Sequence, residues 1–550
     1  MKKIRLEISG MTCDHCARTV ERAMQSVPGA RGASASYPAG RGEAEVEDVV
    51  SELDLIGAVE RAGYGARVLG DSAESERPDS QDGAGGHAEF DLLVIGTGAA
   101  GMAAAIRGAE LGRRVGIVEA ETVGGTCVNV GCIPSKNLLA VAEAAHSARI
   151  GLPGLTGCEP TVDWSEIRDR KDAIVGSLRQ SKYLDVLDGY SEITLLRGEA
   201  RLASDGTVEV AGIRHPAGKV VIATGTSPWT PPISGIDEVD VLTSTTAMEL
   251  ESLPESMIVL GGSAVGLELG QVFARLGVRV TVLELLPQLL PGEEQDAAQE
   301  LRRRLEAEGL EIVTDVNVRS VERTDSGVVV RARTPDGDRI FEGERLMAAT
   351  GRRPSTGSLG LDSAGVEVDE KGYIRVDDGM RSSNPDVYAA GDVAGLPGFV
   401  YVAAAAGRVA AENAVGTGGR TLDLRAVPRV TFTSPQVASV GLGPAEARKR
   451  GLEVDVSRLG LEHVPRAIVE HRTEGWVQVV AEKASGRIIG AQAVAPNAAE
   501  LLGEATVAVR LGLTIQDVTD TLHPYLTWVE GFKLAVQAFQ TDVSKLSCCA

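Results

Sequence analysis

Two glycine-rich turns, GTGAAG at residues 96–101 and GGSAVG at residues 261–266, constrain the fold of this chain more than any other feature. Each turn follows a short apolar strand pattern and opens a helix pattern. Glycines at such a turn let backbone N–H groups approach a pyrophosphate, and the N-terminus of the following helix stabilises the phosphate charge. The sequence therefore predicts an α/β protein with two sheets that each bind a dinucleotide.

Each turn is followed by an acidic residue at the end of the next predicted strand. Glu119 is placed to bind the ribose hydroxyls of the first ligand, and Glu284 those of the second. A carboxylate at Glu284 favours NADH, because it would repel the 2′-phosphate of NADPH, and no Arg or Lys follows within three residues. The predicted binding residues of the turns are Gly96, Gly98, Ala99, Ala100 and Gly101 in the first, and Gly261, Ser263 and Gly266 in the second.

In the second turn Ser263 occupies the position where the middle glycine is usual. A serine side chain is small enough not to block the backbone, so the departure weakens the motif without removing it. The flanking strand and helix patterns keep dinucleotide binding as the better interpretation than a chance turn.

The net charge of −22, from 55 basic and 77 acidic residues, disfavours nucleic acid and anionic membranes as partners. No apolar run approaches the ~18 residues that a membrane span requires. Arg5 and Glu7 lie where a signal peptide would need an unbroken apolar stretch. We therefore predict a cytoplasmic protein.

Composition and periodicity divide the chain into several folding units. The first unit has the order βαββαβ of a ferredoxin-like fold. A polar stretch without apolar period follows it and is predicted to be a flexible linker. The expected units are 1–70, the linker 71–88, a first nucleotide-binding domain in two parts (89–232 and 350–425), a second nucleotide-binding domain at 233–349, and an α+β domain at 426–550.

The chain has seven cysteines, and six of them form close pairs. In a large chain that is predicted to be cytoplasmic, such pairs indicate metal or redox chemistry more than structural disulfides. The pairs are Cys13 and Cys16, Cys127 and Cys132, and Cys548 and Cys549, while Cys158 stands alone in a Gly/Pro loop.

The segment GGTCVNVGCIPSK at residues 124–136 places Cys127 and Cys132 ahead of a helix predicted from Leu138 to Ala148. A helix N-terminus favours the thiolate form of a cysteine. Two buried structural cysteines are the alternative interpretation. The segment, however, resembles the redox-active disulfide of the flavin-dependent disulfide reductases, the class-I pyridine nucleotide-disulfide oxidoreductases. Three further strings agree: ATG at 223–225, ATGRRP at 349–354 and YAAGD at 388–392.

This resemblance covers roughly residues 89–550 and implies FAD at the first turn, a nicotinamide dinucleotide at the second and a C-terminal dimerisation domain. It also implies that Cys132 is the thiolate beside the flavin and Cys127 the outer, exchanging thiol. Asp392 corresponds to the family's ribityl-binding residue, and Glu268 lies near the flavin with Lys136 as a candidate partner. Gly125, Thr126, Thr224, Gly225, Gly351 and Gly391 are the other cofactor-binding residues that the motifs imply.

The C-terminal segment LHPYLTWVEG distinguishes this chain from relatives that reduce organic disulfides. Those relatives carry a His–Glu pair five residues apart, and here the position five residues before Glu530 is Tyr525. A phenol with a pKa of about 10 is a poor base at neutral pH, so Tyr525 disfavours a disulfide substrate. His523 as the base, with Tyr525 packing only, is the alternative.

The chain ends in LSCCA, a vicinal thiol pair suited to capture and transfer of a soft cation. Together with LHPYLTWVEG, this ending is similar to the mercuric reductases. In that family the tail of one subunit passes Hg(II) to the redox cysteines of its partner, which matches Cys548 and Cys549 serving Cys127 and Cys132. One departure is Val241-Leu242 before Thr243, where the family often has a second tyrosine.

The motif GMTCDHC at residues 10–16 is similar to heavy-metal-associated domains. Cys13 and Cys16 are the expected ligands, with Cu(I), Zn(II) and Hg(II) all plausible on softness grounds. The predicted function is reduction of thiol-bound Hg(II) to Hg(0) through FAD by a homodimer. The resemblance implies NADPH as reductant, whereas Glu284 favours NADH. The rival functions are a dihydrolipoyl-dehydrogenase-like disulfide reductase and a non-catalytic soft-metal carrier or sensor.

Overall fold

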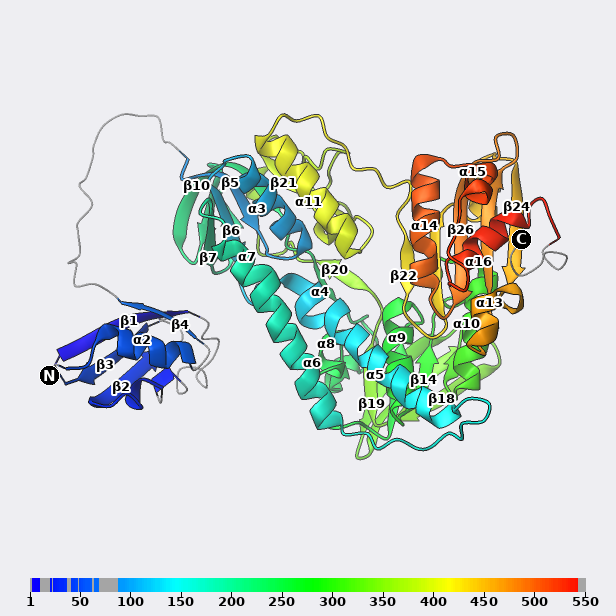
Figure 1. The fold of residues 1–550 in the computed structure, drawn as a ribbon, viewed down its shortest axis with the longest axis horizontal. Coiled ribbons are helices and arrows are strands. Elements are labelled where there is room, and N and C mark those ends of the chain that lie inside the picture. Colours follow the sequence, from blue (N-terminus) through cyan, green and yellow to red (C-terminus); the bar gives the residue numbers. More distant parts are fainter. Residues whose placement is uncertain are drawn as a thin grey trace. The chain divides into compact units, whose positions relative to one another are not determined.

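The computed structural model describes residues 2–9, 20–21, 23–36, 41–47, 49–61, 64–68 and 88–542. The chain divides into two compact units, Met1–Gly86 and His87–Ala550 (Figure 1). The predicted ligands Cys13 and Cys16, the tail cysteines Cys548 and Cys549, and nearly all of the predicted linker lie outside the described residues.

The N-terminal unit contains a four-stranded antiparallel sheet in the order β2-β3-β1-β4. Ile4, Leu6 and Ile8 alternate along β1 and point into the core of the unit. This topology confirms the predicted ferredoxin-like fold. Its elements are β1 Lys2–Ser9, β2 Ala30–Ser36, β3 Arg41–Val46, α2 Glu52–Arg61 and β4 Gly65–Val68.

The larger unit begins with a seven-stranded sheet whose parallel strands β7-β6-β5-β10 lead to the first glycine-rich turn. Helices α3 and α11 pack against each other, so residues far apart in sequence close one face of this sheet (Figure 1). The strands are β5 Phe90–Ile95, β6 Val115–Glu119, β7 Ile193–Arg197, β8 Ala200–Leu202, β9 Thr207–Val210, β10 Ile213–Ile222 and β21 Val387–Ala389.

The helices of this first nucleotide-binding domain include the long pair α5 and α6, which leave the sheet and run along the second domain (Figure 1). A short π-helical segment, η1, continues α6. The helices are α3 Ala99–Glu110, α4 Gly125–Val130, α5 Cys132–Ile150, α6 Trp164–Arg179, η1 Gln180–Leu184, α7 Asp185–Asp188, η3 Asp362–Ala364, η4 Asp392–Ala394 and α11 Val400–Val415.

The second nucleotide-binding domain has a five-stranded parallel sheet in the order β12-β19-β13-β14-β15, beside a three-stranded antiparallel sheet. A two-stranded ribbon, β11 with β20, connects it to the first domain. The elements are β11 Thr226–Pro228, η2 Ile236–Glu238, β12 Val241–Leu242, α8 Ser244–Ala247, β13 Ser256–Leu260, α9 Ala264–Arg275, β14 Arg279–Leu283, α10 Gln295–Ala307, β15 Glu311–Val313, β16 Asn317–Thr324, β17 Gly327–Thr334, β18 Gly337–Gly343, β19 Arg345–Ala348 and β20 Arg352–Pro354.

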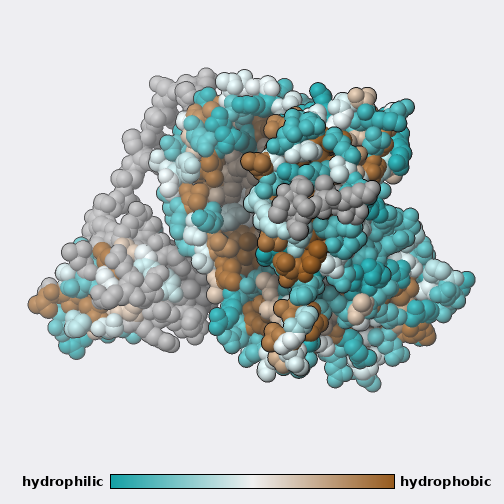
Figure 2. Space-filling view, turned by 45° about the vertical axis from the view of Figure 1, so that its right-hand side comes forward, coloured by the Kyte–Doolittle hydropathy of each residue, from teal (hydrophilic) through white to brown (hydrophobic). Residues whose placement is uncertain are grey.

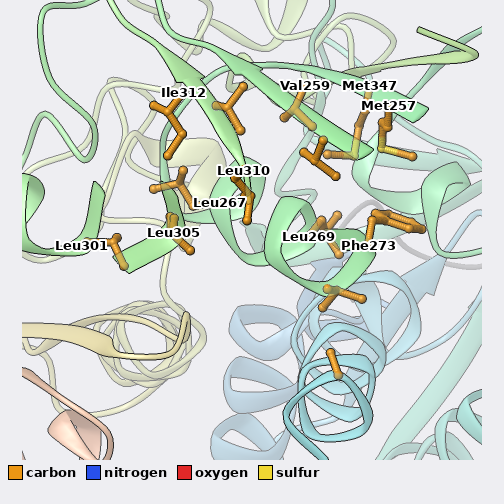
Figure 3. Packing of buried hydrophobic residues seen from close by; sticks show 14 of the residues in the cluster. Met257, Val259, Leu267, Leu269, Phe273, Leu301, Leu305, Leu310, Ile312 and Met347 are labelled. Atoms are coloured by element: carbon orange, nitrogen blue, oxygen red, sulfur yellow. The ribbon is translucent and has the colours of Figure 1, made fainter. Parts of the chain in front are cut away.

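The largest hydrophobic cluster joins the two nucleotide-binding domains. In Figure 3, Leu269 and Phe273 of α9 pack near Met257 and Met347 of the second sheet. Helix α5 of the first domain packs on α9, and its buried Leu138 belongs to the same cluster. The helix that begins at Cys132 is thereby fixed against the helix that begins at the second glycine-rich turn.

The C-terminal domain is a five-stranded antiparallel sheet, β22-β23-β26-β25-β24, with helices packed on one face (Figure 1). It matches the predicted α+β domain. Its elements are β22 Arg429–Thr431, β23 Gln436–Gly441, α12 Pro444–Lys449, β24 Val454–Gly460, η5 Leu461–His463, α13 Pro465–Val469, β25 Trp476–Glu482, β26 Ile488–Ala495, α14 Ala498–Leu511, α15 Ile515–Asp520 and α16 Glu530–Gln537.

Most of the surface in Figure 2 is hydrophilic, with separate hydrophobic patches between the hydrophilic areas. Within the described ranges, no helix is both long and apolar enough to cross a bilayer.

Candidate active site

The first glycine-rich turn lies between β5 and α3, and its glycines are required by close backbone contacts. A Cβ on Gly101 would lie 1.8 Å from the carbonyl oxygen of Gly96. Gly96 has a φ of +107°, and a Cβ there would lie 2.5 Å from the carbonyl oxygen of Ala223. Ala99 and Ala100 form the first turn of α3. Gly98 makes no side-chain capping bond, so the backbone N–H groups at the N-terminus of α3 can bind a phosphate.

The segment that carries the cysteines covers this first turn. A Cβ on Gly125 would lie 2.5 Å from the Cα of Gly98, so the two backbones touch. Thr97 is buried and joins both elements: its hydroxyl accepts a hydrogen bond from the Gly124 amide at 3.0 Å and donates one to the Glu119 carboxylate. Glu119 also accepts from the Glu121 amide at 3.0 Å. The first glycine-rich turn and the cysteine segment are therefore joined by direct backbone contact and hydrogen bonds.

The second turn has the same backbone conformation but is contacted by a different segment: the Leu290 amide donates to the Gly262 carbonyl at 3.0 Å, and a Cβ on Gly262 would lie 2.5 Å from Cδ2 of Leu289. A Cβ on Gly266 would lie 2.0 Å from the carbonyl oxygen of Gly261, which has a φ of +108°. Ser263 is the exposed N-cap residue of α9 and makes no side-chain capping bond. Its extended backbone (φ −90°) suits any residue, which explains why serine is accepted where Gly98 stands in the first turn.

The two cysteines lie on consecutive helices. Cys127 is in α4, and Cys132 is the first residue of α5. The prediction that this helix starts at Leu138 was wrong: Pro134 lies within its first turn, where a missing N–H costs nothing. Cys132 therefore sits directly at the positive end of the helix dipole.

The structure gives the two thiols opposite acidities. A hydrogen bond from Cys127 and the charge of Lys136 lower the pKa of Cys132 to about 7, against the effect of burial. The same hydrogen bond, together with burial, raises the pKa of Cys127. These pKa directions favour the thiolate at Cys132 and the protonated thiol at Cys127.

Lys136 lies one helical turn after Cys132 and connects three domains. Its Nζ is 2.6 Å from Oε2 of Glu268, a buried residue of α9. Oε1 of Glu268 accepts a hydrogen bond from the Phe432 amide at 2.8 Å, and Nζ of Lys136 lies 4.7 Å from the centroid of the Phe432 ring. Phe432 belongs to the C-terminal domain and had no motif to single it out.

A polar chain next to the first turn contains two residues that the sequence motifs did not single out, Thr226 and Arg352. The Thr226 hydroxyl donates to Oδ2 of Asp392 at 3.1 Å and accepts from Nε of Arg352 at 2.7 Å. Nη2 of Arg352 also reaches the hydroxyl of Thr126 at 3.3 Å, on the cysteine segment. Thr226 directly follows the quoted string at 223–225 and Arg352 lies within the string at 349–354, but neither was assigned a role from the sequence.

The remaining motif residues shape the backbone around this chain. Gly391 has a φ of +79°, and a Cβ there would lie 3.1 Å from the Cβ of Ala100 in the first turn. Thr224 donates to the carbonyl of Ser355 at 2.8 Å, and Gly225 and Gly351 both have positive φ. Asp392 therefore approaches the first turn, on the segment that contacts α3.

Tyr525 is 46% exposed, after α15 of the C-terminal domain. His523 has an acidic partner from another part of the domain: its Nε2 lies 2.7 Å from Oε1 of Glu504, and its Nδ1 lies 2.9 Å from the carbonyl oxygen of Thr521. Glu504 lies on α14, outside the spacing that sequence reasoning searched. Burial raises the pKa of Glu530, and the charge of His523 opposes the shift.

Among the described residues, no group of three or more His, Cys, Asp or Glu side chains could hold a metal ion. Val241 begins β12, and Thr243 after it caps α8. Two glycine cradles that side chains would fill, each at a helix N-terminus and each followed by an acid, fit two dinucleotides.

Residues 90–407, more than half of the chain, match the family described as pyridine nucleotide-disulphide oxidoreductase. Residues 427–536 match the dimerisation domain of that family, and residues 5–65 match the heavy-metal-associated domain. The fold and the paired cysteines thus define a pyridine nucleotide-disulphide oxidoreductase, a class that uses FAD and NAD(P)H.

The chain is 43% identical to the mercuric reductase of Acidithiobacillus ferrooxidans, over 99% of this chain and 98% of the relative. It is 45% identical to the mercuric reductase of Streptomyces lividans, over 84% of this chain and 99% of that one. The chain therefore belongs to the mercuric reductase family.

Two solved structures share the fold. One is the Cu(II) complex of a HOCl-induced flavoprotein disulfide reductase from Escherichia coli, with a TM-score of 0.72 and 28% identity, covering 80% of this chain and 98% of that one. The other is LpdA from Mycobacterium tuberculosis, with a TM-score of 0.72 and 28% identity, covering 82% of this chain and 100% of that one.

Proposed function

We propose that this protein reduces thiol-bound Hg(II) to Hg(0) with electrons from a reduced nicotinamide. The observation that carries the proposal is the Cys127–Cys132 pair: a thiolate at a helix N-terminus, hydrogen-bonded by a neighbouring thiol, between two dinucleotide cradles. A carrier or sensor would need neither cradle. The full-length similarity to mercuric reductases supports mercury as the substrate.

The residues around the first turn fit FAD. Gly96, Gly98 and the N-terminus of α3 would hold its pyrophosphate, Glu119 its adenosine ribose and Asp392 its ribityl chain. When bound, FAD supplies the transfer of electrons between nicotinamide and the cysteine pair. Lys136, held by Glu268, keeps a positive charge beside Cys132 and so favours its thiolate form.

The cysteines accept the metal by exchange of thiols. Cys127, as the outer thiol, gives up its proton and replaces one thiol of the incoming Hg(II) complex, and the thiolate of Cys132 replaces the second. The metal then takes two electrons, equivalent to one hydride from the nicotinamide. Both sulfur–mercury bonds break, Hg(0) leaves, and Cys127 and Cys132 remain as thiolates.

Delivery of the metal is assigned to the other two cysteine pairs. In a homodimer, Cys548 and Cys549 of one subunit would pass Hg(II) to Cys127 and Cys132 of its partner, and Cys13 and Cys16 would capture it first. The dimerisation-domain match supports the two-subunit arrangement. The reaction requires reduced nicotinamide and excess thiol, and this requirement supports a cytoplasmic location.

Comparison of Cys132→Ala with Cys158→Ala tests the proposal. Cys158 is an exposed cysteine after α5 and serves as the matched control. We expect the Cys132 variant to lose Hg(II)-dependent nicotinamide oxidation and mercury vapour release, because the metal loses one of its two soft ligands. The Cys158 variant should keep both. Retained turnover in Cys132→Ala would refute the assignment.

A second candidate function, reduction of an organic disulfide, is favoured by the His523–Glu504 contact. This pair could reprotonate a thiol leaving group as a His–Glu base does. The purified protein would then oxidise nicotinamide with lipoamide or glutathione disulfide, and His523→Gln would slow that reaction. Activity that depends on Hg(II) and is indifferent to both disulfides would exclude this candidate.

A further inference from the structure

The acidic residue of the second turn is held in one position by the backbone. Oε2 of Glu284 accepts a hydrogen bond from the Gly262 amide at 2.5 Å, and Oε1 accepts one from the Leu286 amide at 2.8 Å. Glu284 is 6% exposed. Its main chain is fixed by hydrogen bonds to the loop after β15, where Val316 donates to its carbonyl oxygen at 2.9 Å. The carboxylate cannot swing away from the turn without breaking these contacts.

A carboxylate can accept about four hydrogen bonds, so two acceptor positions are left after the two amides. These can take the two hydroxyls of an adenosine ribose, as an acid at this position of the fold does. A 2′-phosphate would instead bring a doubly charged group against a fixed negative charge.

The surroundings of Glu284 offer no compensating cation among the contacts of the described residues. The next two side chains, Leu285 and Leu286, are apolar and 66% and 43% exposed. Asp315, an exposed acid, donates its amide to the carbonyl of Leu286 at 3.0 Å and adds negative charge nearby. Arg302 reaches β15, where its Nε, Nη1 and Nη2 atoms donate to Glu306, Thr314 and the Ile312 carbonyl and not to Glu284.

We infer that this protein selects NADH over NADPH, with Glu284 as the specificity-determining residue and Leu285 at the position where an NADPH-binding site would place a cation. This deepens the proposed function by naming its reductant and rests on that function. It departs from the NADPH that the sequence resemblance implied. The selection of NADH over NADPH is a property of nicotinamide binding, so it can be measured without Hg(II).

Calorimetric titration of the oxidised holoenzyme with NAD⁺ and with NADP⁺ tests the inference. We expect NAD⁺ to bind at least about tenfold more tightly, the size of effect that one close charge produces. Glu284→Gln should reduce the preference for NAD⁺ over NADP⁺, since it removes the negative charge and keeps the shape of the side chain. Equal or tighter binding of NADP⁺ by the unaltered protein would overturn the inference.

Leu285→Arg provides a second variant whose exposed side chain is not needed for folding. It should raise the affinity for NADP⁺ about tenfold by pairing with the 2′-phosphate and leave NAD⁺ binding unchanged. Ile213→Arg, an exposed position in β10 of the other nucleotide domain, is the matched control and should change neither. If Leu285→Arg does not bind NADP⁺ more tightly than the unaltered protein, the assigned position of the 2′-phosphate would be contradicted. Preferential NAD⁺ binding without Hg(II)-dependent oxidation would instead refute the proposed function alone.

Discussion

The two glycine-rich turns have the same backbone conformation but are contacted by different segments of the chain. In the first, Gly125 of the cysteine segment touches Gly98, and Thr97 ties that segment to Glu119. In the second, Ser263 is exposed and the neighbouring Val265 is 45% exposed. The contact between the cysteine segment and the first turn suits a ligand that stays bound, whereas the exposure of Ser263 suits one that exchanges at every cycle. We therefore propose that the first turn holds the resident FAD and the second the nicotinamide.

The largest expected effect comes from disturbing the cover of the first turn. Gly125→Ala would place a Cβ 2.5 Å from the Cα of Gly98, at a position whose φ of +65° already favours glycine. Because backbone atoms cannot yield as a side chain tip can, the pyrophosphate cradle should open. We expect purified Gly125→Ala to carry at least about tenfold less flavin, measured by its visible absorbance. Normal flavin content would contradict the difference between the turns.

Lys136→Met removes the ion pair between Lys136 of the first nucleotide-binding domain and Glu268 of the second. In the unaltered protein the pKa of Cys132 is lowered to about 7, so its thiolate is present above that pH and is lost as the pH falls through it. Removal of the ammonium leaves the Glu268 charge uncompensated and should raise this pKa by about one unit. The pH profile of Cys132 alkylation in the reduced enzyme, followed by mass spectrometry, measures the shift.

Lys371→Met, which removes an exposed lysine away from the cysteines, is the control for this experiment. It should leave the alkylation midpoint near 7. A midpoint in Lys136→Met that coincides with that of the control would show that the charge of Lys136 does not act on Cys132.

Thr97→Val tests the hydroxyl that links the covered turn to the cysteine segment. The substitution keeps the shape but leaves the buried Gly124 amide without its acceptor, which costs about 1–3 kcal/mol. Flavin release on heating should therefore occur at a lower temperature than in the unaltered protein. Thr207→Val, on strand β9, loses only a hydroxyl contact with Asp205 at an exposed turn and should change little. Equal release temperatures would mean that Thr97 does not stabilise the cover.

Ser263→Ala should have the smallest effect of the series. Its hydroxyl makes no capping bond with α9, and its backbone is extended, so alanine fits without strain. We expect flavin content to be unchanged and the nicotinamide KM to change by less than about threefold. A large rise in KM would show that nicotinamide binding at the second turn depends on this hydroxyl.

The glycine motifs, the alternating strands and the cysteine pairs were sufficient to predict the fold class and to single out the cysteines and acids that line the site. These local patterns could not predict contacts between residues that come from distant segments. Glu504 lies on α14, nineteen residues before His523, and Phe432 contacts Lys136 across a domain boundary. The predicted start of α5 at Leu138 was wrong: the helix begins at Cys132, and Pro134 is tolerated in its first turn because the N–H that proline lacks has no intrahelical partner there. Local sequence patterns predict the geometry within a helix or strand, whereas contacts between elements depend on the tertiary fold.

The most direct test is the stoichiometry of mercury reduction by the purified flavoprotein. With Hg(II) in excess thiol, NADH oxidation and trapped Hg(0) vapour would be measured together, with NADPH in parallel. We predict one Hg(0) released per NADH consumed, because each metal ion takes two electrons. Nicotinamide oxidation that proceeds without Hg(II), or without release of Hg(0), would contradict mercury as the electron acceptor.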